Sequence, residues 1–196
     1  MEKEREEQVI SLCQKLIQQK SYSGEESGVV GVLSENMKQM GFDEVTVDKY
    51  GNIIGCIKGN RPGKKVLFDG HIDTVPVTEE AEWLYPPFAA EIHDGKIYGR
   101  GTSDMKGAVA AMTCAASNYA KDTGKDFAGE IYVAGVVHEE CFEGVAAREI
   151  SKNVRPDYVV FGEASQLNLK IGQRGRAEIV IETFGKPCHS ANPEKG

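Results

Sequence analysis

The stretch Lys65-Val66-Leu67-Phe68-Asp69-Gly70-His71-Ile72-Asp73 decides the fold, because it begins with a short apolar run that indicates a strand. Directly after this run come groups that can bind a metal ion. Two further runs, 131–137 and 158–161, are also short, apolar and rich in β-branched and aromatic residues. Such runs are typical of strands that are buried on both faces of a sheet. We therefore expect three strands in the middle of an α/β layer.

Segments with helical spacing of apolar residues alternate with these strands. Ser23, followed three residues later by Glu26, fits a capping box at the start of one helix, and Ser103 can cap another. The expected helices cover about 5–20, 23–40, 104–119 and 142–152, with short strands at 45–47 and 53–57. This order predicts an α/β domain with a mixed, largely parallel sheet that is flanked by helices.

The pattern changes after Gly172. Residues 176–184 alternate between apolar and polar side chains, which indicates an antiparallel strand in a different environment. A lone strand does not form a domain. We therefore expect a first domain over 1–173 and only the beginning of a second domain over 174–196.

Composition excludes several classes of protein. The net charge of −7 argues against nucleic acid or an anionic membrane surface as the main partner. No stretch approaches the ~18 apolar residues of a membrane span. The acidic segment 1–7 is not followed by an apolar signal core, and the five cysteines are scattered, so we expect a cytoplasmic protein with reduced thiols.

Groups that can bind a metal follow each of the three strands. His71 and Asp73 come after the first, His138-Glu139-Glu140 after the second, and Glu163 after the third. Ligands of open α/β sheets bind beyond the carboxyl ends of the strands, and Asp104 stands where a glycine-rich loop enters a helix near that edge. Imidazole and carboxylate without thiolate suit Zn²⁺, Mn²⁺ or Co²⁺.

The residue types suggest a division of labour. One of the adjacent acids Glu139 and Glu140 could bind metal while the other accepts a proton from water, and Asp73 could hold the second imidazole nitrogen of His71. Two ions about 3.5–4 Å apart, bridged by one carboxylate, would activate water and polarise a carbonyl together. Each residue alone also has an ordinary structural explanation, such as an acid at a helix N-terminus for Asp104. Their joint position after strand ends carries the prediction.

Four motifs in order resemble the M20 metallopeptidase family over about residues 5–196. They are Gly70-His71-Ile72-Asp73-Thr74-Val75-Pro76, Gly99-Arg100-Gly101-Thr102-Ser103-Asp104-Met105-Lys106-Gly107, His138-Glu139-Glu140 and Phe161-Gly162-Glu163. The family includes carboxypeptidases, aminoacylases, acetylornithine deacetylase and succinyl-diaminopimelate desuccinylase. The resemblance implies a zinc-exopeptidase-like catalytic domain that is interrupted by an α+β lid or dimerisation domain.

The resemblance also implies a ligand set for two zinc ions per subunit, with Co²⁺ or Mn²⁺ as possible replacements. His71, Asp104 and Glu163 would bind one ion, and Asp104 would bridge to a second ion that Glu140 also holds. A cis peptide is expected after the bridging acid, at Asp104–Met105.

Two further residues receive roles by the same resemblance. Glu139 would be the general base, which takes a proton from the metal-bridging water and passes it to the leaving amine, and Asp73 would orient His71. Residues 175–184 resemble the first strand of the lid. His189 after it would reach the active site of the partner subunit in a homodimer and steady the oxyanion, or it is simply a loop histidine.

The chain lacks two features of full-length members: one more zinc-binding histidine and the contacts to a substrate carboxylate. Our first hypothesis is a two-zinc hydrolase of the amide or peptide bond in a small acyl-amino acid or short peptide, with deacylase and exopeptidase not separable. The alternative is a non-catalytic metal-binding or dimerisation fragment. The intact Glu139 argues against that alternative, because a binding-only protein has no need of a base.

Overall fold

The computed structural model describes residues 2–142, 144–175, 177, 179–182, 184–186 and 188–195. Two compact units make up the chain, Met1–Ala164 and Ser165–Gly196. The larger unit contains the elements α1 (Glu2–Gln18), α2 (Ser27–Gln39), β1 (Glu44–Val47), β2 (Ile53–Lys58), β3 (Arg61–His71), β4 (Glu91–His93), β5 (Lys96–Tyr98), α3 (Gly107–Thr123), β6 (Ala128–Val136), α4 (Val145–Val154) and β7 (Tyr158–Phe161).

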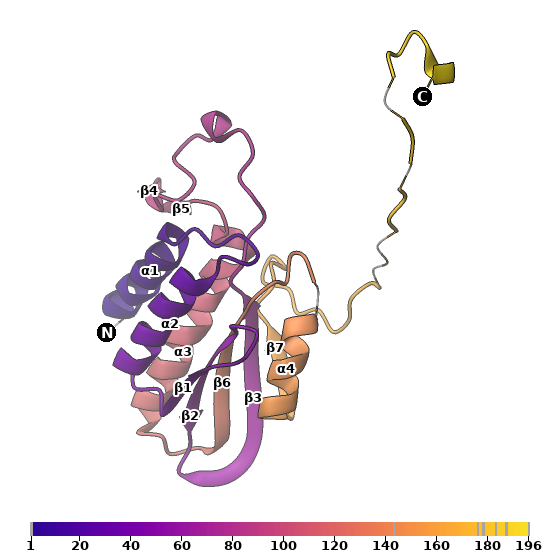
Figure 1. The fold of residues 1–196 in the computed structure, drawn as a ribbon. Helices are drawn as coiled ribbons and strands as arrows, with labels where there is room; N and C mark the ends of the chain where they lie inside the picture. Colours follow the sequence, from indigo (N-terminus) through magenta and orange to yellow (C-terminus); the bar gives the residue numbers. More distant parts are fainter. Residues whose placement is uncertain are drawn as a thin grey trace. The chain divides into compact units, whose positions relative to one another are not determined.

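A five-stranded mixed sheet forms the centre of the larger unit, in the order β1-β2-β6-β3-β7 (Figure 1). β3 pairs in parallel with both β6 and β7, whereas β1 with β2 and β2 with β6 pair antiparallel. The predicted mixed sheet with flanking helices is therefore confirmed. β4 and β5 form a separate hairpin that the sequence did not predict.

The connections between the parallel strands place helices on both faces of the sheet. The chain moves from β3 through α3 to β6 on one side, and then through α4 back across β3 to β7 on the other side. Right-handed crossovers in opposite directions put their helices on opposite faces. Figure 1 agrees, with α1, α2 and α3 packed together on one face and α4 on the other. The carboxyl ends of β3, β6 and β7 thus share the edge where the winding direction reverses.

Close packing brings the start of α3 against the end of β3. A Cβ atom at Gly70 would lie only 2.7 Å from Cε of Met105 and 2.9 Å from Cγ2 of Val109. Only a glycine allows this approach without displacing side chains. As a result, the turn that carries Asp104 lies beside the strand end that carries His71.

Strand β7 differs from the prediction in its burial. Its four residues form a strand as expected, but all are exposed, from 42% for Val159 to 64% for Phe161. β7 stands at the end of the strand order and pairs only with β3. In the described residues it is therefore an edge strand and not one buried on both faces.

Three predictions about helix starts were wrong. α2 begins at Ser27, and Glu26 at its N-cap makes no side-chain capping bond, so the Ser23–Glu26 capping box does not form. Ser103 does not cap α3, because a short distorted turn at Thr102–Lys106 separates it from the helix. α4 begins at Val145, not at 142. Ser23 and Glu26 fail as caps because their side chains hydrogen-bond to residues far away in the sequence.

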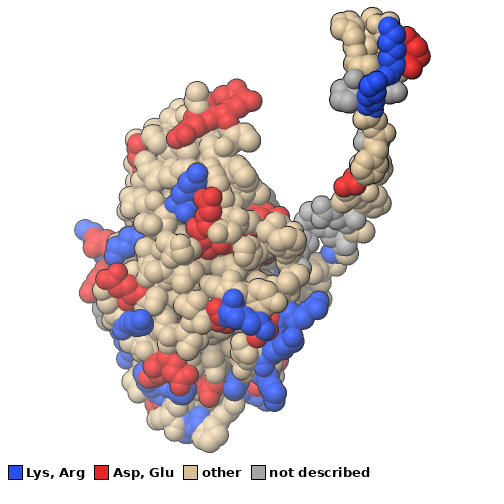
Figure 2. Space-filling model, viewed as in Figure 1, with Lys and Arg blue, Asp and Glu red and all other residues tan. Residues whose placement is uncertain are grey.

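In the smaller unit, the described residues contain one short 3₁₀ turn, Pro193–Lys195, and no strand. The strand predicted at 176–184 includes Arg176, Glu178 and Thr183, which lie outside the described residues, so that strand and the 173/174 domain boundary stay predictions. Among the described helices, none is both long and apolar enough to cross a membrane. Acidic and basic side chains are interspersed over the face of the larger unit that Figure 2 shows.

Candidate metal centre

One imidazole and several carboxylates meet at the shared edge of the sheet. Nε2 of His71 lies 2.9 Å from Oδ1 of Asp104 and 4.0 Å from Oε1 of Glu163. The ligand atoms of His71, Asp104 and Glu140 all lie within 4.8 Å of one another. Four separate segments supply these groups: the end of β3, the turn before α3, the loop after β6 and the residues after β7. The structure therefore brings together all four predicted metal ligands.

The turn that carries Asp104 is anchored to the end of α1. The peptide bond between Asp104 and Met105 is cis, as the resemblance implied. Two residues later, the fully buried Lys106 extends its ammonium group to the end of α1, where Nζ donates to the carbonyl oxygens of Leu16 at 3.0 Å and Gln19 at 2.8 Å. Burial lowers the pKa of Lys106 to about 8. Lys106 belongs to the glycine-rich motif 99–107, which predicted no role for it.

The electrostatics of the cluster suit a cation. Burial raises the pKa of both Glu140 and Glu163, and neighbouring carboxylates such as Asp104 add to the rise. Burial alone would lower the pKa of His71, but its hydrogen bonds with Asp73 and Asp104 outweigh that effect and raise the pKa to about 10. Acids that resist ionisation and an imidazole that holds a proton are the signs of clustered negative charge. A divalent ion would neutralise this charge.

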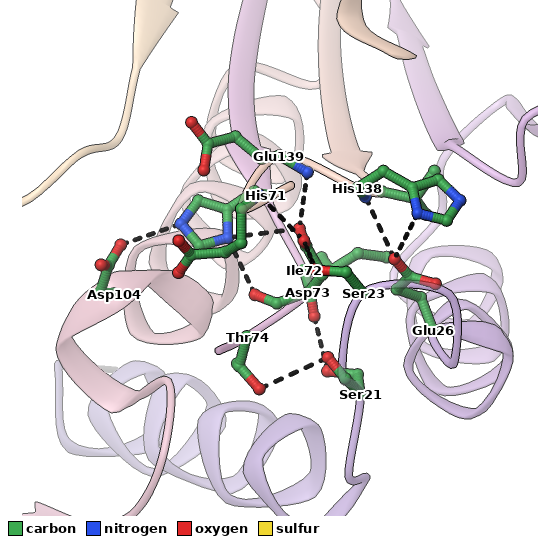
Figure 3. A network of polar contacts seen from close by, with 12 residues as sticks. Ser21, Ser23, Glu26, His71, Ile72, Asp73, Thr74, Asp104, His138 and Glu139 are labelled. Atoms are coloured by element: carbon green, nitrogen blue, oxygen red, sulfur yellow. Dashed lines mark hydrogen bonds and ion pairs between the residues drawn. The ribbon is translucent and has the colours of Figure 1, made fainter. Parts of the chain in front are cut away.

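Asp73 connects the metal ligands to the loop after β6. Its backbone oxygen lies 2.9 Å from Nδ1 of His71, and its Oδ1 lies 3.6 Å from the same nitrogen. The fully buried carboxylate also accepts hydrogen bonds from Ser23 Oγ at 2.6 Å and from the backbone N–H groups of Glu139 and Glu140, both at 3.1 Å (Figure 3). Burial would raise the pKa of Asp73, but the contact with His71, followed by the hydrogen bonds from Ser23 and the two backbone N–H groups, lowers it.

Glu139 lies next to the ligand cluster and is half-buried. In Figure 3 its side chain is on the same side of the network as the His71 ring and Asp104. Burial raises the pKa of Glu139, and the charges of Glu163 and Glu140 raise it further. A carboxylate with a raised pKa is a better proton acceptor near neutral pH.

Several residues of the site carried no functional prediction. Ser23 and Glu26 lie in the connection between α1 and α2, where their spacing indicated a capping box. Ser23 instead donates a hydrogen bond to Asp73 after β3, and Glu26 accepts one from the backbone of the loop after β6. Asn52, assigned only to a turn, is fully buried and accepts the Val137 N–H at 3.0 Å. Asp69 is 7% exposed, and burial together with the charge of Glu163 raises its pKa to about 6. Its position two residues before His71, on the same face of β3, was the available signal.

His189 belongs to the smaller unit, where its Nδ1 accepts the N–H of Ala191 at 3.2 Å. The preceding Pro187 lies outside the described residues. The role of His189 at a partner's site stays a prediction.

Comparison with known proteins agrees with this geometry. Residues 67–194, which contain every predicted metal ligand, match the model of peptidase family M20/M25/M40. The chain belongs to this family. The cluster around His71 supplies a group of residues that could hold a metal ion.

Two curated relatives show how much of a family protein the chain represents. It is 38% identical over 178 residues to the uncharacterized protein YgeY of Escherichia coli (strain K12), covering 90% of this chain and 43% of YgeY. It is 32% identical over 198 residues to succinyl-diaminopimelate desuccinylase 2 of Ruegeria sp. (strain TM1040), covering 95% of this chain and 50% of that protein. The chain thus spans about half the length of the curated relatives it matches.

A solved structure with the same fold is the M20 family metallo-carboxypeptidase Sso-CP2 from Sulfolobus solfataricus. The TM-score is 0.67 at 22% identity, over 79% of this chain and 37% of that one. At this identity the likeness concerns the fold alone.

Proposed function

We propose that the protein to which this chain belongs is a two-zinc hydrolase of an amide or peptide bond in a small acyl-amino acid or short peptide. The observation that carries the proposal is the convergence of His71, Asp104 and Glu140 within 4.8 Å, with Glu139 beside them. A cluster that only bound metal would need the ligands but not an adjacent carboxylate with a raised pKa.

The donor set fits zinc. One imidazole nitrogen and several carboxylate oxygens are ligands that Zn²⁺ accepts readily, and Co²⁺ and Mn²⁺ accept them too. The side chains of Asp104 and Glu163 are 61% and 51% exposed, so an ion can reach them from solvent. His71, Asp104 and Glu163 would hold one ion, and Asp104 and Glu140 would hold the other. When bound, such ions polarise a carbonyl and lower the pKa of water.

The chain's own groups supply the remaining steps. His71 must lose its proton from Nε2 before it binds metal, and the Asp73 backbone oxygen beside Nδ1 keeps the other proton in place. Glu139 accepts a proton from the attacking water at its carboxylate and delivers it to the leaving nitrogen. Asp73 orients His71 and also fixes the backbone of Glu139 and Glu140 through two hydrogen bonds.

The substrate class stays broad. One relative is named a desuccinylase and one structural neighbour a carboxypeptidase, which supports removal of an acyl group and cleavage of a terminal residue equally. We further propose a cytoplasmic homodimer. Residues 174–196 would begin its lid domain, and His189 would steady the oxyanion in the partner's active site.

Substituting Glu139 tests the catalytic proposal. In the full-length protein loaded with Zn²⁺, we expect Glu139→Gln to lower kcat by roughly 10²–10⁴-fold, the usual contribution of a general base, while bound zinc is unchanged by elemental analysis. Glu82→Gln, at an exposed acid of the loop after β3, serves as the matched control and should change neither quantity.

Two outcomes would contradict the proposal. Full activity of Glu139→Gln would remove Glu139 from the mechanism. A full-length protein that binds zinc but hydrolyses no acyl-amino acid or dipeptide would favour the alternative of a metal-binding module without catalysis.

A further inference from the structure

The connection between α1 and α2, residues Ser21–Glu26, runs along the chain segment that follows His71. Tyr22 forms a parallel bridge with Thr74. The buried Ser21 donates from Oγ to the carbonyl oxygen of Ile72 at 2.7 Å and accepts the N–H of Thr74 at its own carbonyl at 2.8 Å. This connection, which we call the α1–α2 turn, is therefore fixed to the backbone beside the metal-binding imidazole.

Two side chains of the α1–α2 turn reach further into the site (Figure 3). Ser23 donates to Oδ2 of Asp73 at 2.6 Å, and Oε1 of Glu26 accepts the backbone N–H of His138 at 3.1 Å. Gly24 lies between them with φ of +95°, a conformation that few other residues adopt without strain. The turn thus contacts both the strand end with His71 and the loop with Glu139 and Glu140.

The loop after β6 depends on side chains for its hydrogen bonds. Four successive backbone N–H groups, those of residues 137–140, donate to side-chain oxygens, and the acceptors are Asn52, Glu26 and, twice, Asp73. His138 has φ of +58°, a left-handed conformation that is strained for a non-glycine residue. Such a conformation persists only where neighbouring contacts impose it, and Glu26 supplies the contact at His138 itself.

We propose that Glu26 is a positioning residue for Glu140. By accepting the N–H of His138, its carboxylate sets the direction in which the loop leaves β6, and so places the Glu140 side chain next to His71 and Asp104. Glu26 is only 5% exposed and makes no capping bond to its own helix; its Oε1 instead contacts His138, accepting the backbone N–H and lying 3.7 Å from Nδ1 of the ring. This inference rests on the proposed function, in which Glu140 is a metal ligand.

Zinc binding by the metal-free chain tests the proposal without any need for activity. The zinc-binding isotherm of Glu140→Ala, compared with that of the unsubstituted chain, identifies the binding step that requires Glu140. We expect Glu26→Ala to weaken that step about 10-fold, as is typical when the residue that supports a ligand is removed. Glu26→Gln keeps an oxygen in the same place and should restore affinity to within about threefold. Glu25→Ala removes the same charge from the exposed neighbouring position and is the matched control.

A double-mutant cycle separates positioning from general loss of structure. If Glu26 acts through Glu140, then Glu26→Ala should add no further loss of zinc affinity in the Glu140→Ala background. The proposal would be overturned if Glu26→Ala lowered zinc affinity equally in the unsubstituted chain and in the Glu140→Ala variant. It would also be overturned if Glu26→Ala caused no loss in the unsubstituted chain. Loss of affinity by Glu25→Ala as large as that by Glu26→Ala would also overturn it, because the effect would then be one of net charge.

Amide hydrogen exchange tests the role of Glu26 independently of the proposed zinc binding. If the unsubstituted chain binds no zinc, the two-zinc assignment is wrong. Amide hydrogen exchange of the metal-free chain still tests whether Glu26 positions the loop after β6. Faster exchange in Glu26→Ala confined to residues 138–140 would support the positioning contact. Unchanged exchange there, or a uniform rise that includes β6, would contradict it.

Discussion

Two groups of acidic side chains lie at the same edge of the sheet in opposite environments. Asp104, Glu140 and Glu163, the ligand acids, face solvent in part, and the first and last have side chains 61% and 51% exposed. Asp73 and Glu26, the frame acids, are 0% and 5% exposed. Burial and neighbouring charge raise the pKa of Glu163, whereas hydrogen bonds lower the pKa of Asp73 although it is the more deeply buried.

The difference shows that burial alone does not decide how a carboxylate behaves here. The frame acids are compensated by backbone N–H groups and, for Asp73, also by a serine hydroxyl and the His71 imidazole, so these contacts stabilise the fold. The ligand acids mainly face one another and His71, and no backbone N–H group among the described residues donates to them, so a bound cation would offset their mutual repulsion. Fold stability and metal binding should therefore be separable by substitution.

The largest effect on stability is expected for Asp73→Ala. The substitution removes a fully buried carboxylate and leaves three part-buried donors, the N–H groups of Glu139 and Glu140 and the Ser23 hydroxyl, without their acceptor. We expect the free energy of unfolding to fall by about 3 kcal/mol or more. Urea unfolding in the presence of EDTA measures this, because chelation removes any contribution from bound metal. A loss below about 1 kcal/mol, the level of a surface contact, would show that Asp73 is not part of the frame.

Asp104→Ala is the same chemical change in the other group and should have the opposite profile. Its side chain is largely exposed and, among the described residues, hydrogen-bonds only to His71, so the free energy of unfolding in EDTA should change by less than about 1 kcal/mol. Zinc affinity should fall on the order of 100-fold or more, because binding energy depends on each ligand. Calorimetric titration with Zn²⁺ makes the comparison. Equal destabilisation by Asp73→Ala and Asp104→Ala would remove the distinction between the two groups.

The ligand acids could be predicted from the sequence because the pattern that indicates them is local. Strand ends are recognisable from apolar runs, and His71, Glu140 and Glu163 each follow one closely. Parallel strands then bring their carboxyl ends to one edge by topology alone. The mixed sheet and its helices followed from the same periodicities.

Asp73 was predicted as the partner of His71, but its contacts with Ser23 and with the loop after β6, and the whole role of Glu26, were missed because these partners are far apart in the sequence. Glu26 binds His138 across 112 positions, and Ser23 binds Asp73 across 50. The spacing of Ser23 and Glu26 matches a local capping box, and no local pattern distinguishes a carboxylate that caps its own helix from one that reaches another loop. The exposure of β7 was missed for a similar reason, since an apolar strand has the same composition at the centre and at the edge of a sheet.

The smallest and most diagnostic effect is expected for Glu163→Gln. The folded pKa of Glu163 is raised, so its ionised form is disfavoured in the folded chain, and its contribution to stability is lost as pH rises through that pKa. Removing the charge should therefore stabilise the metal-free chain at pH 7. Because the side chain is half exposed and solvent screens it, we expect a gain of only a few tenths of a kcal/mol.

The pH dependence of that gain separates the two groups of acids. The stabilisation by Glu163→Gln should disappear near pH 3, below the ordinary glutamate pKa of 4.5, where the carboxyl group is protonated in the folded and the unfolded chain alike, and should shrink in high salt. Asp73 behaves in the reverse sense: its lowered pKa contributes stability above the ordinary aspartate pKa, and this is lost as pH falls. The loss for Asp73 takes place only below the ordinary aspartate pKa of 3.8, so thermal unfolding in EDTA at pH 7 and pH 3 tests both. A Glu163→Gln variant that is less stable than the unsubstituted chain at pH 7 would place Glu163 among the acids that hold the fold together.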